Sequence, residues 1–212
     1  MVDDFMGSPS NEETNGRHGP VATARATILS RAVVIARVDG LEGLSIKMLA
    51  SELGISASDV VVLFGNRQAL QLEVLDTTIE IFKAAIVEPT LEESSAVKRL
   101  LRICEGWFDY VERRGRGGCI LYAAAEAYRS RPGPVRDRVN FHRTAWLGLL
   151  KATIAKAKRA AEFERHIDVE QLTFELTAFQ EAAHSAAIAG DQAAFLRARN
   201  SCRNRVLEGR TR

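Results

Sequence analysis

The sequence predicts an all-α fold in which a three-helix N-terminal domain with a helix-turn-helix precedes a larger helical domain. Three observations support this prediction. From Pro20 onward, apolar residues recur at spacings of three and four, the period of an amphipathic helix. Residues 45–64, "SIKMLASELGISASDVVVLF", form two short amphipathic segments separated by Gly54. The one β-like run, "VVVLF", is short and lies in a helical register.

Composition limits the class of protein. The 212 residues are 46% hydrophobic and 26% charged, which is ordinary for a soluble globular chain. The net charge of +2 means that any nucleic-acid footprint must be local. No apolar run approaches the roughly 20 residues of a membrane span, and the N-terminus lacks a basic-then-apolar signal, so we expect a cytoplasmic protein without a membrane partner. Three widely spaced cysteines, Cys104, Cys119 and Cys202, predict buried thiols rather than a disulfide framework or a redox sensor.

The N-terminal part divides into a tail and a compact domain. Residues 1–19 are polar and rich in Gly, Ser and Asn, which predicts a disordered tail. The domain then covers residues 20–66, and its first helix ends at Asp39-Gly40. Ser45 and Ser56 are the expected N-caps of the next two helices. The apolar face of the first helix consists of Ile28, Leu29, Ala32, Val33 and Ala36.

Longer helices make up the second domain, residues 67–207. Asn66 is the expected N-cap of its first helix, which ends before Pro89. "RRGRGG" at 113–118 and "RPGP" at 131–134 interrupt the pattern, and Gly190 ends a later helix. Residues 208–212 are expected to fray. The predicted helices cover about 67–87, 97–112, 119–128, 135–154, 172–186 and 191–207.

The helix-turn-helix is specific because several buried positions must agree within twenty residues. Ala50 is small enough for the crossing of the two helices, and Gly54 supplies the backbone freedom of the turn. Two ordinary packed helices are the competing interpretation. The expected buried positions are Leu49, Leu53, Ile55, Val60 and Leu63. The side chains left to face a DNA groove are Ser56, Ala57, Ser58, Val61 and Val62.

This predicted reading surface is poor in polar groups. It contains no Arg, Asn or Gln for bidentate base recognition, although apolar groups can contact a thymine methyl. Asp59 would oppose phosphates, whereas Lys47, Arg67 and the Ser45 hydroxyl can contact them. Arg25 is a further candidate for contact with DNA. Specificity is therefore expected to depend on DNA shape as well as on base contacts.

Residues 25–70 resemble the DNA-binding domain of the tetracycline-repressor (TetR) family of bacterial regulators. The shared elements begin with Arg25-x-x-Ile28-Leu29-x-x-Ala32 and include Gly40, Ser45, Ala50, the turn "LGIS" at 53–56, Phe64 and Arg67-x-x-Leu70. Members of the family usually carry Tyr, often followed by His, where this chain has Val61 and Val62, and Lys where it has Arg67. The tyrosine normally anchors a phosphate, so its replacement bears on DNA affinity more than on the fold.

Residues 117–139, "GGCILYAAAEAYRSRPGPVRDRV", followed by Trp146, are similar to a ligand-binding domain of that family. The resemblance implies an all-helical homodimer that binds a small-molecule effector and grips a palindromic operator in double-stranded DNA. Paired recognition helices must then span about 34 Å. Small residues between 182 and 187 suit a dimer interface, although packing within one chain explains them equally well.

Aromatic and polar residues of the second domain are candidates for an effector pocket, with core packing as the alternative for each. They suggest an apolar or aromatic effector. The histidines show no metal-ligand spacing, so neither a metal nor a cofactor is expected. No catalytic motif is present, and Glu126 with His142 is too little to indicate an enzyme. The candidates are Trp107, Tyr110, Tyr122, His142, Trp146, Phe174 and Phe179.

These observations predict a ligand-responsive transcriptional regulator, in the first interpretation a repressor that an effector releases from its operator. The alternative is a small-molecule-binding or protein-interaction module of the same fold that has weak or lost specific DNA binding. The valine-bearing reading surface and the modest local charge motivate that alternative.

Overall fold

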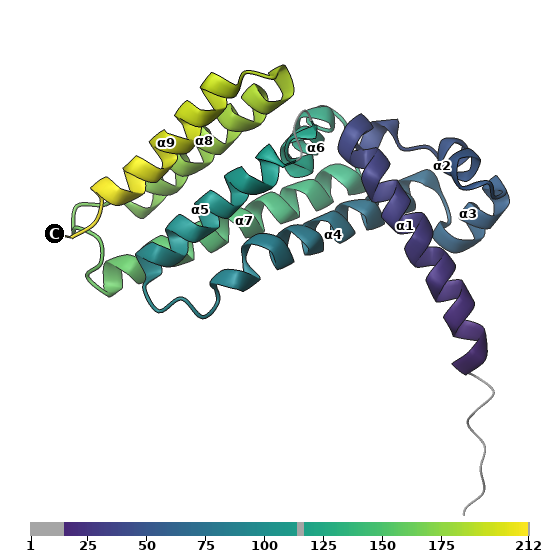
Figure 1. Cartoon of the computed structure of the whole chain (residues 1–212), viewed down its shortest axis with the longest axis horizontal. Coiled ribbons are helices and arrows are strands. Elements are labelled where there is room, and N and C mark those ends of the chain that lie inside the picture. The colour runs from purple at the N-terminus through teal and green to yellow at the C-terminus, as the bar shows by residue number, and fades with distance from the viewer. Residues whose placement is uncertain (1–14, 114–116, 212) are drawn as a thin grey trace, which may run out of the picture.

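The computed structural model describes residues 15–113 and 117–211, and within them the fold is all-α, as predicted (Figure 1). A smaller N-terminal group of helices packs against one end of a longer helical bundle. The helices are α1 Asn15–Gly43, α2 Ile46–Leu53, α3 Ala57–Phe64, α4 Arg67–Ile86, α5 Ala96–Glu112, α6 Ile120–Ala127, α7 Pro134–Arg159, α8 Val169–Ala189 and α9 Gln192–Glu208, with a 3-10 turn at Glu88–Thr90.

The first helix starts earlier than predicted. Residues 1–14 of the predicted tail lie outside the described residues, but α1 begins at Asn15, inside the segment expected to be disordered. At the other end, Gly40 adopts φ 72°, a left-handed conformation that breaks the helix where Asp39-Gly40 was predicted to end it.

The helix-turn-helix follows with the predicted caps. The Ser45 hydroxyl accepts a hydrogen bond from the Met48 N–H, and the Ser56 hydroxyl accepts one from the Asp59 N–H. Gly54 ends α2 in the left-handed conformation (φ 65°). Leu49 and Val60 are fully buried between the helices, as predicted.

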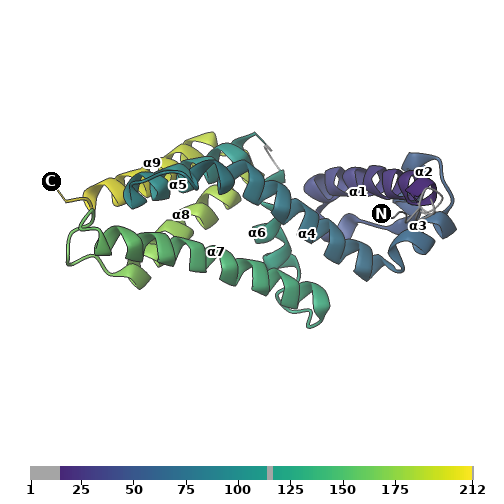
Figure 2. The ribbon, with the colours of Figure 1, turned by 90° about the horizontal axis from the view of Figure 1, so that it is seen from below.

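Helix α4 connects the two domains. Asn66 caps it through a hydrogen bond to the Ala69 N–H, and the helix then runs from the helix-turn-helix into the bundle (Figure 2). Near its start, the Gln71 amide donates to the Leu41 carbonyl at 2.5 Å, which ties α4 to the end of α1. Helix α4 also packs on α5, α6 and α7. A movement in the bundle can therefore reach the helix-turn-helix through one continuous helix.

The bundle consists of α4 to α9, and α8 and α9 pack side by side along their length (Figures 1 and 2). Arg199 of α9 fixes this pair to α5, because its guanidinium bonds Glu105 at 2.7 Å and Asp109 at 2.6 Å. Asp168 caps α8 and Gly190 ends it in the left-handed conformation, as its position predicted. Within the described residues, no helix is long and apolar enough to cross a membrane.

The three cysteines are free and buried, as predicted. Cys104 of α5 and Cys202 of α9 face each other, and the hydrogen bond with Cys202, together with burial, raises the pKa of the Cys104 thiol. The Cys104 thiol therefore stays protonated, and both buried cysteines pack as small apolar groups in the α5–α9 contact.

The prediction of a frayed C-terminus was wrong for residues 208–211. Arg210 forms an isolated antiparallel bridge with Phe163, and the Thr211 N–H donates to the Glu162 carbonyl at 3.1 Å. Helical periodicity cannot show this contact, because it depends on backbone groups of the α7–α8 connection. Glu162 in turn caps α5, since its carboxylate accepts hydrogen bonds from the Ala96 and Val97 N–H groups, both at 3.0 Å.

Candidate nucleic-acid interface and ligand cavity

The exposed face of α3 is the face that the sequence predicted. Val60 is buried, whereas Val61 is 45% and Val62 83% exposed. Ser56, Ala57 and Ser58 at the start of α3 are also exposed. A bulky apolar side chain as exposed as Val62 carries a cost in water that DNA contact would remove.

Ile55 does not fit the expected pattern. It was predicted to lie in a buried position but is 36% exposed. The physical reason is its place in the turn: Ile55 follows Gly54, and its N–H donates to the Ala50 carbonyl at 3.1 Å, which keeps this residue at the surface end of α2. Leu53 and Leu63 are half-buried and pack against the core.

The polar groups of α3 serve the helix itself. Ser56 and Asp59 form a reciprocal capping box, in which the Asp59 carboxylate accepts from the Ser56 N–H at 3.2 Å. The Ser58 hydroxyl lies 2.8 Å from that of Ser56. Asp59, expected to oppose phosphates, therefore has a structural partner, and the hydroxyl groups nearest a groove already share hydrogen bonds.

The predicted phosphate contacts are also partly occupied. Arg25 pairs with Glu73 of α4 through both guanidinium nitrogens, one at 2.6 Å, and lies over the Phe64 ring at 4.9 Å. Arg67 donates to the carbonyls of Glu42 and Leu44, the second at 2.8 Å. These two arginines join α1, α3 and α4.

Two predicted phosphate contacts remain on α2. The Ser45 hydroxyl oxygen accepts the Met48 N–H as the N-cap, and its O–H group can still donate to a phosphate oxygen. Lys47, in the first turn of α2, is exposed and has no ion-pair partner among residues 15–113 and 117–211. Lys47 is therefore the clearest available cation of the predicted DNA surface.

In the bundle, four predicted effector residues come together. Trp107, Tyr110, Tyr122 and Trp146 line one small inner cavity of about 10 Å³, with α4 contributing Phe82. Phe82 packs edge-to-face on Tyr110 and on Trp146, both with ring centroids 5.1 Å apart. A cavity of this size holds about one water molecule, so the aromatic rings fill most of the space between α4, α5, α6 and α7.

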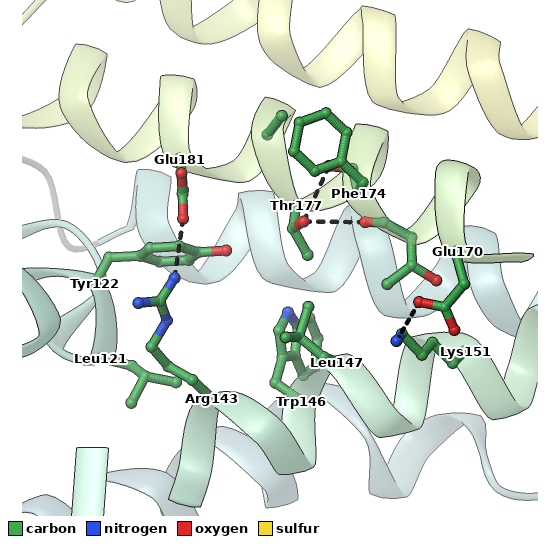
Figure 3. A pocket seen from close by; sticks show the side chains of 12 residues that line it. Leu121, Tyr122, Arg143, Trp146, Leu147, Lys151, Glu170, Phe174, Thr177 and Glu181 are labelled. Carbon is green, nitrogen blue, oxygen red and sulfur yellow. Dashed lines mark hydrogen bonds and ion pairs between the residues drawn. The ribbon is translucent and has the colours of Figure 1, made fainter. Parts of the chain in front are cut away.

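A larger groove of about 430 Å³ opens beside this cavity, between α6, α7 and α8 (Figure 3). Tyr122 and Trp146 line both spaces, and Phe174, 66% exposed, lies on the rim of the groove. At one end of the groove Arg143 pairs with Glu181 at 3.2 Å across Tyr122. At the other end Lys151 pairs with Glu170.

A recess of about 310 Å³ lies on the other side of the Arg143–Glu181 pair. Both residues line the groove and the recess, and so does Tyr122. His184 lines the recess, and its ring stacks on Tyr122 with centroids 5.7 Å apart. Tyr122 is thus the one side chain shared by the inner cavity, the groove and the recess.

Two buried polar side chains of α8 face Tyr122. Gln180 is fully buried, and its side-chain oxygen accepts from the Trp146 indole N–H at 2.9 Å and from the Tyr122 hydroxyl at 3.4 Å. His184 is 5% exposed and accepts the Cys119 N–H at its Nδ1 atom, at 3.1 Å. Burial lowers the pKa of His184 and raises the pKa of Tyr122, so both side chains stay neutral.

Two predicted effector residues lie elsewhere. His142 is buried, but its Nε2 atom lies 2.7 Å from the Asp76 carboxylate of α4, and it lines none of the three cavities. Phe179 is half-buried on the side of α8 that packs toward the core and also lines none of them. His142 therefore joins α7 to α4, where Arg138 also pairs with Asp76.

The sequence interpretation did not select Gln180, His184, Arg143 or Phe82. Gln180 and His184 are one turn apart on α8, so a polar i, i+4 pair on the apolar face of a predicted helix was the signal that could have found them. Within the described residues, no group of three His, Cys, Asp or Glu side chains could hold a metal ion.

Known proteins share this architecture. Residues 96–202, half of the chain, match the family model of the tetracyclin repressor-like C-terminal domain. No curated protein matches the chain. Several solved structures share the fold. A TetR-family transcriptional regulator from Cytophaga hutchinsonii is 18% identical with a TM-score of 0.80, covering 92% of this chain and 98% of its own.

Some of the similar structures contain ligands. A putative transcriptional regulator from Saccharomonospora viridis, in complex with choline, is 19% identical with a TM-score of 0.78, and the match covers 90% of this chain and 99% of that one. FadR from Bacillus subtilis, in complex with stearoyl-CoA, is 14% identical with a TM-score of 0.67, and the match covers 88% and 99%.

Proposed function

Because the chain belongs to the tetracycline-repressor (TetR) family of transcriptional regulators, we propose that it binds a palindromic operator as a homodimer and acts as a repressor that a small-molecule effector releases. The observation that carries this proposal is the continuity of α4, which begins at the helix-turn-helix and ends as a wall of the aromatic cavity. The family has no enzymatic activity, so binding alone must account for the function.

The helix-turn-helix supports the DNA-binding part of the proposal. Its recognition helix presents Val61 and Val62 on an exposed face, and Lys47 extends from α2 beside it. The exposed N-terminal turn of α3 can direct backbone N–H groups at phosphates. The apolar centre would contact thymine methyl groups and would read a groove chiefly by its shape.

The face of α8 and α9 that points away from the bundle supports a homodimer. Ala182 and Ser185, which were predicted to favour an interface, are exposed, whereas Ala183 and Ala186 are buried within the chain. Leu196 of α9 is 42% exposed next to them. Small side chains allow the α8 helices of two copies to approach closely, so an Ala182→Arg variant should sediment as a monomer. Ala26→Arg on the exposed face of α1 is the matched control.

The three connected spaces around Tyr122 support an effector site. An effector that enters between Tyr122 and Trp146 must displace aromatic rings, because the inner cavity is too small for more than about one water molecule. Phe82 of α4 is one of those rings, and α6, which carries Tyr122, packs on α1. Both contacts would transmit the displacement to the DNA-binding domain, at a coupling free energy of typically 1–3 kcal/mol.

The first test is selection of bound duplexes from a random pool by the purified protein, followed by titration at two salt concentrations. We expect an enriched palindrome with half-sites about one helical turn apart, and affinity that falls steeply with salt. Val62→Asp should weaken binding by roughly tenfold or more, because it places a carboxylate against phosphates. Val38→Asp is the matched control, because Val38 is 78% exposed on α1, outside the recognition helix. It should change the DNA affinity by less than about twofold.

The alternative is a binding module of the same fold without specific operator affinity. The pairing of Arg25 with Glu73 and of Arg67 with backbone carbonyls favours it, because both remove cations that a DNA surface would use. A pool without enrichment, bound only weakly and without sequence preference, would support this alternative and contradict the operator proposal.

A further inference from the structure

The buried polar groups beside Tyr122 indicate the chemistry of the ligand. We propose that the Gln180 amide and the His184 imidazole bind the carboxylate of an aromatic or aliphatic acid, whose apolar part lies against Tyr122 and Trp146. This inference rests on the proposed effector site and specifies its ligand class.

The orientation of the Gln180 amide follows from its neighbours. The Trp146 indole can only donate a hydrogen bond, so the Gln180 atom 2.9 Å from it must be the oxygen. The Tyr122 hydroxyl donates to the same oxygen. The Gln180 nitrogen is therefore fixed on the other side, fully buried and without a hydrogen-bond partner in the described part of the chain.

His184 offers a second donor of the same kind. Its Nδ1 atom accepts the Cys119 N–H, so in the neutral ring the proton is on Nε2. That nitrogen is also buried without a partner among the described residues. Gln180 and His184 are one turn apart on α8 and both contact Tyr122, Gln180 at the hydroxyl and His184 through the stacked rings, so both unpartnered donors belong to neighbours of this side chain.

Two buried donors without acceptors favour a ligand that supplies oxygen atoms. A buried polar group is normally hydrogen-bonded, because an unmade bond costs the whole desolvation of that group. A carboxylate has two acceptor oxygens and no hydrogen, whereas an ammonium group would bring further donors to the same place.

A positive charge is available to balance the carboxylate. Arg143 lines both the groove and the recess beside Tyr122, and its present partner Glu181 has a side chain 54% exposed. An exposed ion pair contributes little and can exchange partners. Glu126 and Arg129 also line the recess, and Glu181 would turn to solvent when a carboxylate takes its place on Arg143.

Tyr122 controls access to this site. Its hydrogen bond to Gln180, at 3.4 Å, is at the long limit, and its ring separates the inner cavity from the groove and the recess. A rotation of Tyr122 away from Gln180 would join these spaces and would expose the Gln180 amide to a ligand.

The test is calorimetric titration of the full chain, without DNA, with a matched pair of probes: 2-naphthoate and 2-naphthylmethylammonium. We expect naphthoate to bind the wild-type protein at least about tenfold more tightly. Equal affinity for both probes, or tighter binding of the ammonium, would overturn the proposal.

Gln180→Glu sharpens the test, because it keeps an oxygen for Trp146 and Tyr122 and replaces the amide donor by a second oxygen. It should weaken naphthoate by roughly tenfold or more and favour the ammonium probe. Gln171→Glu, the same change at an exposed position of α8, should leave both affinities within about twofold. Unchanged naphthoate affinity in the Gln180→Glu variant would contradict the assigned donor.

A second variant protects the test if Gln180→Glu folds poorly. His184→Asn retains an acceptor for the Cys119 N–H but removes the Nε2 donor, so it should weaken naphthoate and leave the melting temperature nearly unchanged. Specific operator binding without a preference for naphthoate would reject this inference alone. A preference for naphthoate without any operator would reject the proposed regulator alone.

Discussion

The helix-turn-helix domain and the helical bundle differ in whether their candidate binding groups already have hydrogen-bond partners. In the first, the arginines that could contact DNA already bond Glu73 or backbone carbonyls, and the serines of α3 cap their own helix. In the second, the amide nitrogen of Gln180 and the Nε2 atom of His184 are buried without partners in the described residues. The named groups of the small domain stabilise its fold, whereas these two groups of the large domain still have bonds to make.

This difference teaches where ligand specificity can arise. Arg25 and Arg67 must first exchange their present partners before they can add to DNA affinity. A buried unsatisfied donor favours any ligand that completes it. Specificity for a small molecule can therefore be sharp in this chain, while under the proposed function recognition of DNA would depend on shape, on Lys47 and on the exposed valines.

The largest expected effect comes from the wall of the inner cavity. Trp107 is 1% exposed, so Trp107→Ala should lower the free energy of unfolding by about 3–5 kcal/mol. Phe141→Ala, at a ring 65% exposed on α7, should cost less than about 0.5 kcal/mol. Urea unfolding measures both. A small effect of Trp107→Ala would mean that the cavity is not part of the core and would remove the contrast between the domains.

The contrast between the two domains would become smaller if the exposed face of α3 gained a cation for DNA. Val62→Lys should strengthen binding to any duplex by about fivefold at physiological salt and should steepen the dependence of log K on log salt by about 0.9. Fluorescence anisotropy at several salt concentrations measures both quantities. An unchanged salt slope would show that position 62 does not face phosphates.

Release of a cation already present should act more weakly. Glu73→Gln removes the negative charge that holds Arg25, so we expect DNA affinity to rise by about twofold to fivefold. The partly exposed ion pair should contribute no more than about 1 kcal/mol to stability. The Arg25→Ala, Glu73→Gln double variant is the control, because the gain requires Arg25. A gain that persists in it would contradict this explanation.

The smallest effect is a pH dependence. Burial lowers the pKa of His184 below its ordinary 6.5, so the unfolded chain binds the proton more readily. The stability that neutral His184 provides is present above pH 6.5 and is lost as the pH falls through that value toward the lower folded pKa. Nearby Glu126 opposes this shift. The midpoint of urea unfolding should therefore fall more between about pH 8 and pH 5 for the wild type than for the His184→Asn variant.

Most of the helices could be predicted because their signals are local. Ser45, Ser56 and Asn66 cap helices where their positions indicated, and Gly40 and Gly54 end them. The C-terminal bridge to Phe163 could not be predicted, since it joins backbone atoms from distant segments. Ile55 shows a similar limit, because exposure in a turn depends on the path of the chain rather than on hydrophobicity.

The sequence could predict the residues of the cavity only where the type of residue alone identifies them. Large aromatic residues in a helical domain commonly gather in the core, so Trp107, Tyr110, Tyr122 and Trp146 could be selected together. The role of Gln180 depends on which atom faces Trp146, and that of His142 on Asp76 of another helix. Such partners come from elements far apart in the chain, and no local pattern specifies them.

The continuity of α4 also has a mechanical consequence. A helix of 20 residues is about 30 Å long, so it works as a lever whose two ends lie in different domains. A rotation of about 6° at the cavity end displaces the other end by about 3 Å, close to the 3.4 Å rise of one base pair. Under the proposed function, a small rotation at the cavity would therefore be enough to move the recognition helix by about the spacing of one base pair.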